Sequence, residues 1–421
     1  MHRQRKCVII NQECRRHSCC KRFGGAALAE GEYRVVQSDV EEMHEKIRAH
    51  RRKILGWTGI AVVVLLLVLV AGYIYFQTRV YSKYEVIKSV TREDSVGTKF
   101  VSFAGNVLKY GKDGALCIDE ENQLIWNQTY EMEAPIVDVC EGYAIIAEKK
   151  GNQIYIMDAK GKCGEIETNM PIQRVQVANQ GTVAILMEQD GTGYLQLYDK
   201  EGTFLAEGEV HIENSGYPLD ITLSNDGRKM AVSLLDINEG NVKNTITFYN
   251  FGSVGQNEID NIVGIYAYSD MIFPKIEFLT NDTMVAFGDQ KAIIFEGTQK
   301  PQVKKEIPLK QEVRSIFYNE IYIGFVFNND DAKQPYKMSV YDLRGTEEMS
   351  ENFDMDYSEI SFLENNEICI RNDLECSIYN LRGNRKFHYN FENNIWKVFS
   401  TNNSREYIFM MNGETQKVRL K

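Results

Sequence analysis

Histidine is scarce in this sequence, and its scarcity limits the chemistry that the chain can carry. Six histidines occur among 421 residues, and only His211 and His388 follow residue 76. Zinc sites and serine-type catalytic triads both draw on histidine, so two widely separated histidines leave little material for either. We therefore expect a protein that is not an enzyme, with no catalytic, metal-binding or cofactor-binding residues to name.

A basic surface is also missing from the larger part of the chain. Residues 77–421 contain 35 Lys and Arg against 52 Asp and Glu, which gives a formal charge of −17. Such a charge repels phosphate, and no basic stripe interrupts it. Nucleic acid is therefore disfavoured as a partner, whereas proteins, peptides and wall polymers remain candidates.

Charged residues are absent between Ile54 and Phe76, a stretch that reads ILGWTGIAVVVLLLVLVAGYIYF. As a helix it rises about 34 Å, which is enough to cross a hydrocarbon core of about 30 Å. A cleavable signal peptide is the alternative, but the stretch begins far into the chain, is too long, and ends in bulky residues such as Tyr73 and Tyr75. The sequence therefore predicts one transmembrane helix over residues 54–76, retained as a signal anchor.

The charges beside this helix predict its orientation. Residues 1–53 contain 13 Lys and Arg against seven Asp and Glu, and a basic cluster from Arg48 to Lys53 stands directly before the helix. Basic residues next to a span stay in the cytoplasm, so the tail lies inside and the rest of this cell-membrane protein outside. The predicted organisation is a cytoplasmic basic tail (1–53), the transmembrane helix (54–76), a short linker (77–83) and an extracytoplasmic domain (84–421).

The first part of the tail lacks the apolar periodicity that would bury a core, and we expect it to be disordered. The spacing of Cys7, Cys14, Cys19 and Cys20 matches none of the paired patterns that are typical of structural zinc sites. Reduced, unpaired thiols are the favoured interpretation. Met43 is an alternative start of the chain, and a protein that began there would lack these cysteines.

Residues 84–421 consist of short apolar segments separated by turns, and helical spacing is nearly absent. Runs such as residues 154–157 are typical of strands, and the turns contain pairs such as Asp190-Gly191, which supply the backbone angles of tight hairpins. This pattern predicts an all-β fold. Since about 340 residues are too many for one sandwich, we expect a repeat architecture.

The repeat predicts a β-propeller, because four strands recur about every 36 to 56 residues. With eight blades, the last unit has room for only three strands before Lys421, so we expect residues 84–90 to supply its fourth strand and close the ring. Seven blades are the alternative, because residues 238–270 are irregular. The first strands of the eight units are predicted near Lys99, Ile136, Ile172, Leu219, Lys275, Val313, Glu359 and Trp396.

One hairpin carries a resemblance to known propellers. Residues 223–232, LSNDGRKMAV, resemble the S-x-D-G-x-x-h-A hairpin of WD-repeat and Tol-type propellers, and the turn-rich blades resemble quinoprotein-like propellers. The whole layout resembles an uncharacterised family of single-pass bacterial membrane proteins that carry a domain of unknown function. The resemblance implies a propeller outside the membrane, but it implies no activity, because one fold hosts many functions.

These observations predict a non-catalytic binding, scaffold or sensor module of the cell envelope. The alternative is an envelope enzyme or a cofactor-binding, quinoprotein-like propeller, although the adjacent cysteine pair of quinone-dependent dehydrogenases has no counterpart in the domain. A pocket of several hundred Å³ at the channel mouth, lined by carboxylates and aromatic rings, would favour this alternative. A channel filled by side chains would favour the binding module.

Two further features carry hypotheses about specific residues. Cys369 and Cys376 lie directly opposite each other if Asn372-Asp373 form a two-residue turn, at a Cα separation of about 5.5 Å or less, within the reach of a disulfide. Packing as small apolar residues is the favoured alternative.

The acidic turns at 119–122 and 328–331 are candidates for calcium, but neither has the residue order of a dedicated loop, and we expect solvated turns.

Overall fold

The computed structural model describes residues 37–94, 97–119 and 121–421, so the four cysteines of the tail lie outside the described residues. Helix α1 (Gln37–Thr78) contains a segment, Glu42–Gly72, that is long and apolar enough to cross a membrane. The chain divides after Phe76, and the residues that follow form one compact unit.

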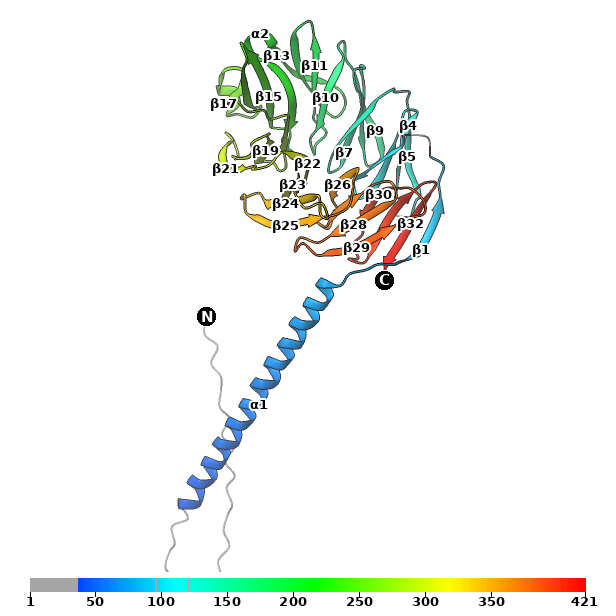
Figure 1. The fold of residues 1–421 in the computed structure, drawn as a ribbon. Helices are drawn as coiled ribbons and strands as arrows, with labels where there is room; N and C mark the ends of the chain where they lie inside the picture. Colours follow the sequence, from blue (N-terminus) through cyan, green and yellow to red (C-terminus); the bar gives the residue numbers. More distant parts are fainter. Residues whose placement is uncertain (1–36, 95–96, 120) are drawn as a thin grey trace, which may run out of the picture. The chain divides into compact units, whose positions relative to one another are not determined.

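This unit consists of eight antiparallel four-stranded sheets that follow one another around a ring (Figure 1). Each sheet is a blade, and the blades are numbered here in chain order. The first strand of each blade is the innermost, since first strands of neighbouring blades contact one another around the central channel. Blades 1 to 4 comprise β2 (Lys99–Phe103), β3 (Asn106–Tyr110), β4 (Gly114–Ile118), β5 (Leu124–Thr129), β6 (Pro135–Cys140), β7 (Tyr143–Glu148), β8 (Gln153–Asp158), β9 (Gly161–Glu167), β10 (Ile172–Val177), β11 (Val183–Gln189), β12 (Thr192–Tyr198), β13 (Phe204–His211), β14 (Tyr217–Leu223), β15 (Lys229–Asn238), β16 (Asn241–Asn250) and β17 (Ile262–Ser269).

The last blade closes the ring by joining the two ends of the domain. Strand β1 (Tyr84–Thr91) pairs antiparallel with the final strand of the chain, from Tyr84 opposite Leu420 to Thr91 opposite Glu414. The predicted closure by residues 84–90 is therefore confirmed. Blades 5 to 8 comprise β18 (Lys275–Phe278), β19 (Thr283–Phe287), β20 (Lys291–Glu296), β21 (Gln302–Pro308), β22 (Val313–Tyr318), β23 (Tyr322–Asn328), β24 (Tyr336–Asp342), β25 (Glu347–Phe353), β26 (Glu359–Phe362), β27 (Ile368–Arg371), β28 (Glu375–Tyr379), β29 (Arg385–Asn390), β30 (Ile395–Ser400), β31 (Glu406–Met411) and β32 (Glu414–Leu420), together with β1.

The prediction of eight blades is confirmed, and every predicted first strand lies within a residue or two of an observed one. The seven-bladed alternative is wrong. Residues 238–270 are irregular because strands β15 and β16 are both ten residues long, and because an insertion separates β16 from β17. That insertion contains two short 3₁₀ turns, η1 (Gly255–Asn257) and η2 (Ile259–Asn261), and a further short helix, α2 (Ile212–Ser215), precedes β14.

The core lies between the blades, where alternating strand residues of one sheet pack on those of the next. Phe387 of blade 7 and Phe409 of blade 8, for example, are both fully buried, with ring centroids 6.0 Å apart. Tyr81 adds to this cluster from before β1, and its backbone N–H donates a hydrogen bond to the carbonyl oxygen of Lys386 at 2.8 Å. The propeller unit therefore includes a residue that the sequence predicts to be a linker.

The WD-like hairpin shows why its motif has this sequence. The Ser224 hydroxyl donates to Asp226 Oδ1 at 2.7 Å and accepts from the backbone N–H of Lys229 at 2.9 Å. Gly227 has a φ of 64°, a left-handed conformation that glycine adopts without strain. The turn directs Lys229 into the protein, where its Nζ lies 2.8 Å from Asp282 Oδ1 in blade 5. The motif therefore has a structural role, because its lysine joins blade 4 to blade 5.

Candidate functional site

Charged side chains from four neighbouring first strands gather in the central channel. Lys275 Nζ lies 3.1 Å from Asp220 Oδ2 and 2.7 Å from Glu277 Oε2, and Arg174 Nε lies 3.5 Å from Asp220 Oδ1. Asp138 joins from β6, where its Oδ2 accepts the backbone N–H of Val177 at 2.7 Å. Alternation along each strand places these residues on the channel side. Their charges are largely paired with one another, which ties blades 2 to 5 together.

The carboxyl groups of this network are shifted by burial. Burial, together with the nearby negative charge of Glu277, raises the pKa of Asp138 to about 7. Burial also raises the pKa of Glu277 itself, although Lys275 opposes the shift. For Lys275, burial is the largest influence and would lower the pKa, but Glu277, Tyr318 and Asp220 together outweigh it and the pKa is raised. Asp138 therefore changes charge near neutral pH.

The cavity at this end of the channel is small, at about 190 Å³. Asp138, Glu277, Glu320 and Tyr318 all line it, so carboxylates and an aromatic ring meet there as the enzymatic alternative requires. Its volume is nevertheless below the range of roughly 300 to 1,000 Å³ that is usual for ligand pockets. The channel end resembles a filled core more than a binding pocket.

The two histidines of the domain lie far apart in the ring, on β13 of blade 3 and β29 of blade 7. His388 Nδ1 lies 3.0 Å from Ser377 Oγ, and its Nε2 lies 3.7 Å from Glu375 Oε1, which is the residue order of a catalytic triad. Ser377 is only 1% exposed, however, and it lines none of the cavities described here. A substrate would not reach its hydroxyl.

Carboxylates of the two acidic turns close their own loops. Asp119 Oδ1 accepts the backbone N–H groups of Glu121 and Gln123, and Asp331 Oδ1 accepts that of Lys333. Across the residues described by the structure, no group of three or more His, Cys, Asp and Glu side chains is arranged to hold a metal ion.

The predicted arrangement of Cys369 and Cys376 is wrong in register. The N–H of Asn372 bonds the carbonyl of Glu375, so the turn consists of Asp373 and Leu374, one residue later than expected. Cys369 therefore pairs with Ile378 and lies diagonal to Cys376. Both side chains still share one buried face, with sulfur atoms 3.7 Å apart, and both are thiols. This arrangement agrees with the favoured interpretation of two packed, reduced thiols, and the disulfide stays a hypothesis.

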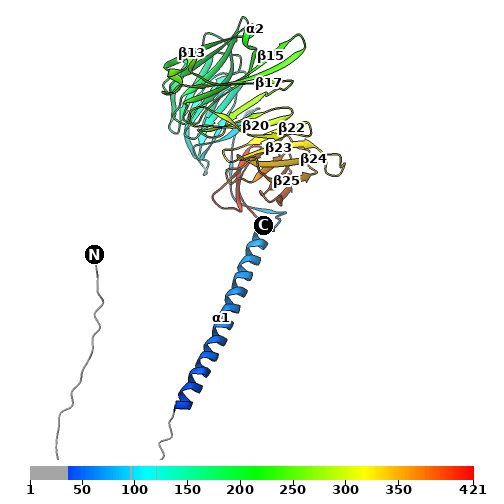
Figure 2. The same ribbon diagram turned by 90° about the vertical axis from the view of Figure 1, so that its left-hand side faces the viewer.

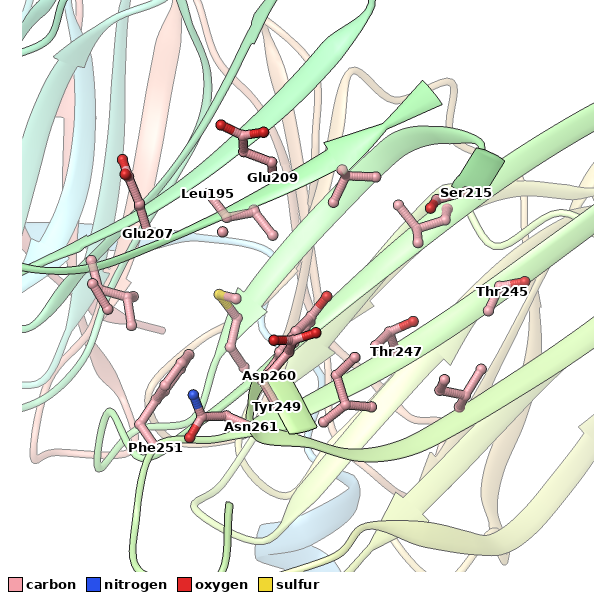
Figure 3. Close-up of a pocket in the computed structure, with 18 of the residues that line it drawn as sticks. Leu195, Glu207, Glu209, Ser215, Thr245, Thr247, Tyr249, Phe251, Asp260 and Asn261 are labelled. Atoms are coloured by element: carbon pink, nitrogen blue, oxygen red, sulfur yellow. The ribbon is translucent and has the colours of Figure 1, made fainter. Parts of the chain in front are cut away.

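A much larger cavity, of about 650 Å³, lies between blades 3 and 4 (Figure 3). The labels of β13, β15 and β17 locate this boundary in both ribbon views (Figure 2). We call it the outer groove, because it opens beside the last strands of the two blades. Its lining residues are Leu195, Leu197, Ala206, Glu207, Gly208, Glu209, Val210, Ser215, Met230, Leu234, Asp236, Lys243, Thr245, Thr247, Tyr249, Phe251, Asp260, Asn261, Ile262 and Ile265.

The outer groove exists because β13 presents small residues to blade 4. Ala206 and Gly208 stand opposite Leu197 and Leu195 and share their face of the sheet. A Cβ atom built on Gly208 would meet no other atom within 4 Å. The last strand of blade 2 has a bulge at the equivalent position, so Ile166 there corresponds to Gly208. Ile166 is only 3% exposed. A missing side chain, rather than a backbone opening, therefore makes the space.

The opposite wall of the outer groove is strand β16. Lys243, Thr245, Thr247 and Tyr249 alternate along it and line the groove, and they span about 20 Å at about 3.3 Å per residue. Figure 3 shows Asp260, from the insertion after β16, close to Tyr249 at one end. Burial raises the pKa of Tyr249, and the charge of Asp260 raises it further.

Sequence reasoning did not identify the outer groove. Its signals were present, since β13 reads FLAEGEVH with small residues on one face, and since the irregular stretch before β17 supplies one end of the groove. Neither signal predicts a cavity, because the sequence does not show which face of each sheet packs against the next blade.

Comparison with known proteins supports the fold. A model for a family of unknown function (DUF5711) matches residues 77–420. The C-terminal WD40 domain of Sif2 is 12% identical, with a TM-score of 0.51 over 81% of this chain and 99% of that domain. BamB from Moraxella catarrhalis is 12% identical, with a TM-score of 0.46 over 80% and 100% of the two chains. No curated protein matches the chain.

Proposed function

The chain belongs to the DUF5711 family of unknown function, and we propose that it is a membrane-anchored, extracytoplasmic propeller that binds a partner without transforming it. It acts as a scaffold or sensor module of the cell envelope. One combination of features carries the proposal: an apolar helix precedes a closed ring whose channel-end cavity is small, while its largest described cavity is a groove between blades.

The orientation in this proposal rests on charge. The basic cluster from Arg48 to Lys53 favours a cytoplasmic N-terminus, and the acidic domain then lies outside. Single cysteines introduced as Glu45→Cys and Ile265→Cys, both at exposed positions, test it in intact cells stripped of any wall. A membrane-impermeant maleimide should label the second variant well above the unmodified protein and the first only after lysis. The reverse pattern would show that the orientation is wrong.

Binding without catalysis is tested at the triad-like arrangement of Ser377, His388 and Glu375. A fluorophosphonate probe should not label Ser377, because its hydroxyl is buried beside His388. Probe labelling that is lost in the Ser377→Ala variant would instead support the enzymatic alternative. Crosslinking in intact cells, followed by mass spectrometry of the captured molecules, tests whether a stable partner exists at all.

A further inference from the structure

We infer that the outer groove between blades 3 and 4 is a binding site for an extended peptide segment that carries basic and apolar side chains. The inference rests on the proposed binding function and gives it a site and a class of ligand.

The shape of the groove favours an extended chain. Its wall along β16 runs for about 20 Å, the length of six or seven residues in a strand. Its rims are β13 and β17, the outermost strands of their blades, each of which pairs with a neighbour on one side within the sheet. Such edges accept an added strand through backbone hydrogen bonds.

The groove also contains polar groups that lack partners. Among the residues that the structure describes, none forms a hydrogen bond with the hydroxyl groups of Thr245, Thr247 or Tyr249. All three lie on the groove-facing side of β16, and Thr247 is 5% exposed. Hydroxyl groups held in a recess that is part polar and part apolar are suited to the backbone N–H and C=O groups of a peptide.

Charge complementarity selects a basic ligand. Four carboxylates, from Glu207, Glu209, Asp236 and Asp260, belong to the lining against the single cation Lys243. Figure 3 shows the carboxylates of Glu207 and Glu209 directed away from the strand that bears Thr245, so they add to the negative potential around the groove without facing its interior. In the described part of the chain, Asp236 and Asp260 form no ion pair and remain available to a cation.

The apolar part of the lining selects the other side chains of the ligand. Leu195, Met230 and Leu234 form the floor and are each between 4% and 6% exposed. At the rim, Ile265 is 61% exposed and points to the same side of the sheet as Thr247, its cross-strand partner. A peptide that alternates apolar and basic residues satisfies both kinds of surface. A neutral or anionic glycan would leave the carboxylates unpaired and the apolar floor uncovered.

Peptide binding to the purified full chain in phosphatidylcholine nanodiscs tests the inference. The probe is a fluorescein-labelled peptide of about seven residues in which leucine and lysine alternate, with a leucine–glutamate peptide as its counterpart. Fluorescence anisotropy should show saturable binding of the first peptide, weaker at higher salt because the attraction is electrostatic. The glutamate peptide should not bind.

Two variants locate the binding. Gly208→Trp fills the groove where a Cβ meets no atom, and it should weaken binding at least about tenfold. Gly142→Trp is the matched control at another glycine with open space around it, and it should bind as the unmodified protein does. A second arm that does not depend on the folding of Gly208→Trp is Asp236→Asn with Asp260→Asn, expected to weaken binding about tenfold and to reduce its salt dependence.

Three outcomes would overturn the inference. They are no binding of the lysine peptide, equal binding by the two tryptophan variants, and a preference for a glucosamine oligomer over the peptide. None of these outcomes bears on the orientation or on the absence of catalysis, which the maleimide and fluorophosphonate measurements test independently.

Discussion

The boundary between blades 2 and 3 is closed at its outer side, whereas the boundary between blades 3 and 4 is open there. Both boundaries join blades with the same strand order. At the first, Ile166 is buried, and a Cβ on Gly164 would collide with the backbone of blade 3 at Lys200. At the second, Gly208 faces empty space.

The difference teaches that a blade boundary has two separable parts. The inner part is held by the hydrophobic cluster of the inner strands and by the charged network, which includes Arg174 of blade 3 and Asp220 of blade 4. The outer part depends on the size of side chains on the last strand. A propeller therefore gains a groove by losing side chains at one outer position, with its ring intact.

The largest expected effect comes from opening the closed boundary. Ile166→Gly should lower the free energy of unfolding by about 3 to 5 kcal/mol, because it leaves a cavity among buried residues and loosens a strand. The reciprocal Gly208→Ile, which fills the open boundary, should change it by less than about 1 kcal/mol. Urea unfolding of the full chain measures both. Equal losses would show that the two boundaries are packed alike.

Backbone contact at the closed boundary gives the next effect. Gly202 has a φ of 86°, and a Cβ there would collide with the carbonyl oxygen of Glu165 in blade 2. We expect Gly202→Ala to cost about 1 to 3 kcal/mol, through strain and overpacking. Gly208→Ala is the control and should be within about 0.5 kcal/mol of the unmodified protein. A harmless Gly202→Ala would mean that the closed boundary has spare room.

A pH-dependent effect follows from Asp138, whose hydrogen bond to Val177 crosses the closed boundary. The pKa of Asp138 is 3.8 in the unfolded chain and about 7 in the folded protein, so protonated Asp138 favours folding. This contribution to stability is complete below about pH 4 and is lost as the pH rises through about 7. Asp138→Asn should match the unmodified protein at pH 4 and exceed it by about 1 to 3 kcal/mol at pH 8. Thermal unfolding across this range measures the difference, and an advantage that does not change with pH would contradict it.

The smallest expected change in stability concerns the ion pair between Arg174 and Asp220, on the channel side of the boundary between blades 3 and 4. Arg174 is 45% exposed and lies 3.5 Å from Asp220, which keeps Lys275 and the backbone N–H of Ile276 as partners. Arg174→Ala should therefore cost less than about 1 kcal/mol. A loss above about 2 kcal/mol would show that this pair, rather than apolar packing, closes the inner part of the boundary.

Local sequence patterns predict the blades well because apolar alternation and turn residues mark each strand within a few residues. The alternation in residues 154–157 and the turn at Asp190-Gly191 mark β8 and the end of β11, and the shortage of residues before Lys421 predicts that β1 completes blade 8. The register around Cys369 was predicted incorrectly, because a turn shifted by one residue changes every cross-strand partner, and composition alone does not distinguish the two turns.

The amino-acid sequence by itself determined an apolar helix, an all-β domain of eight four-stranded units and their closure by β1, since these depend on hydrophobic periodicity and turn chemistry along the chain. Only the tertiary structure decided where charges meet in the channel, that Ser377 is buried beside His388, and that Gly208 opens a groove. Those outcomes depend on which faces of which sheets oppose each other. That choice is made by packing between residues far apart in the sequence.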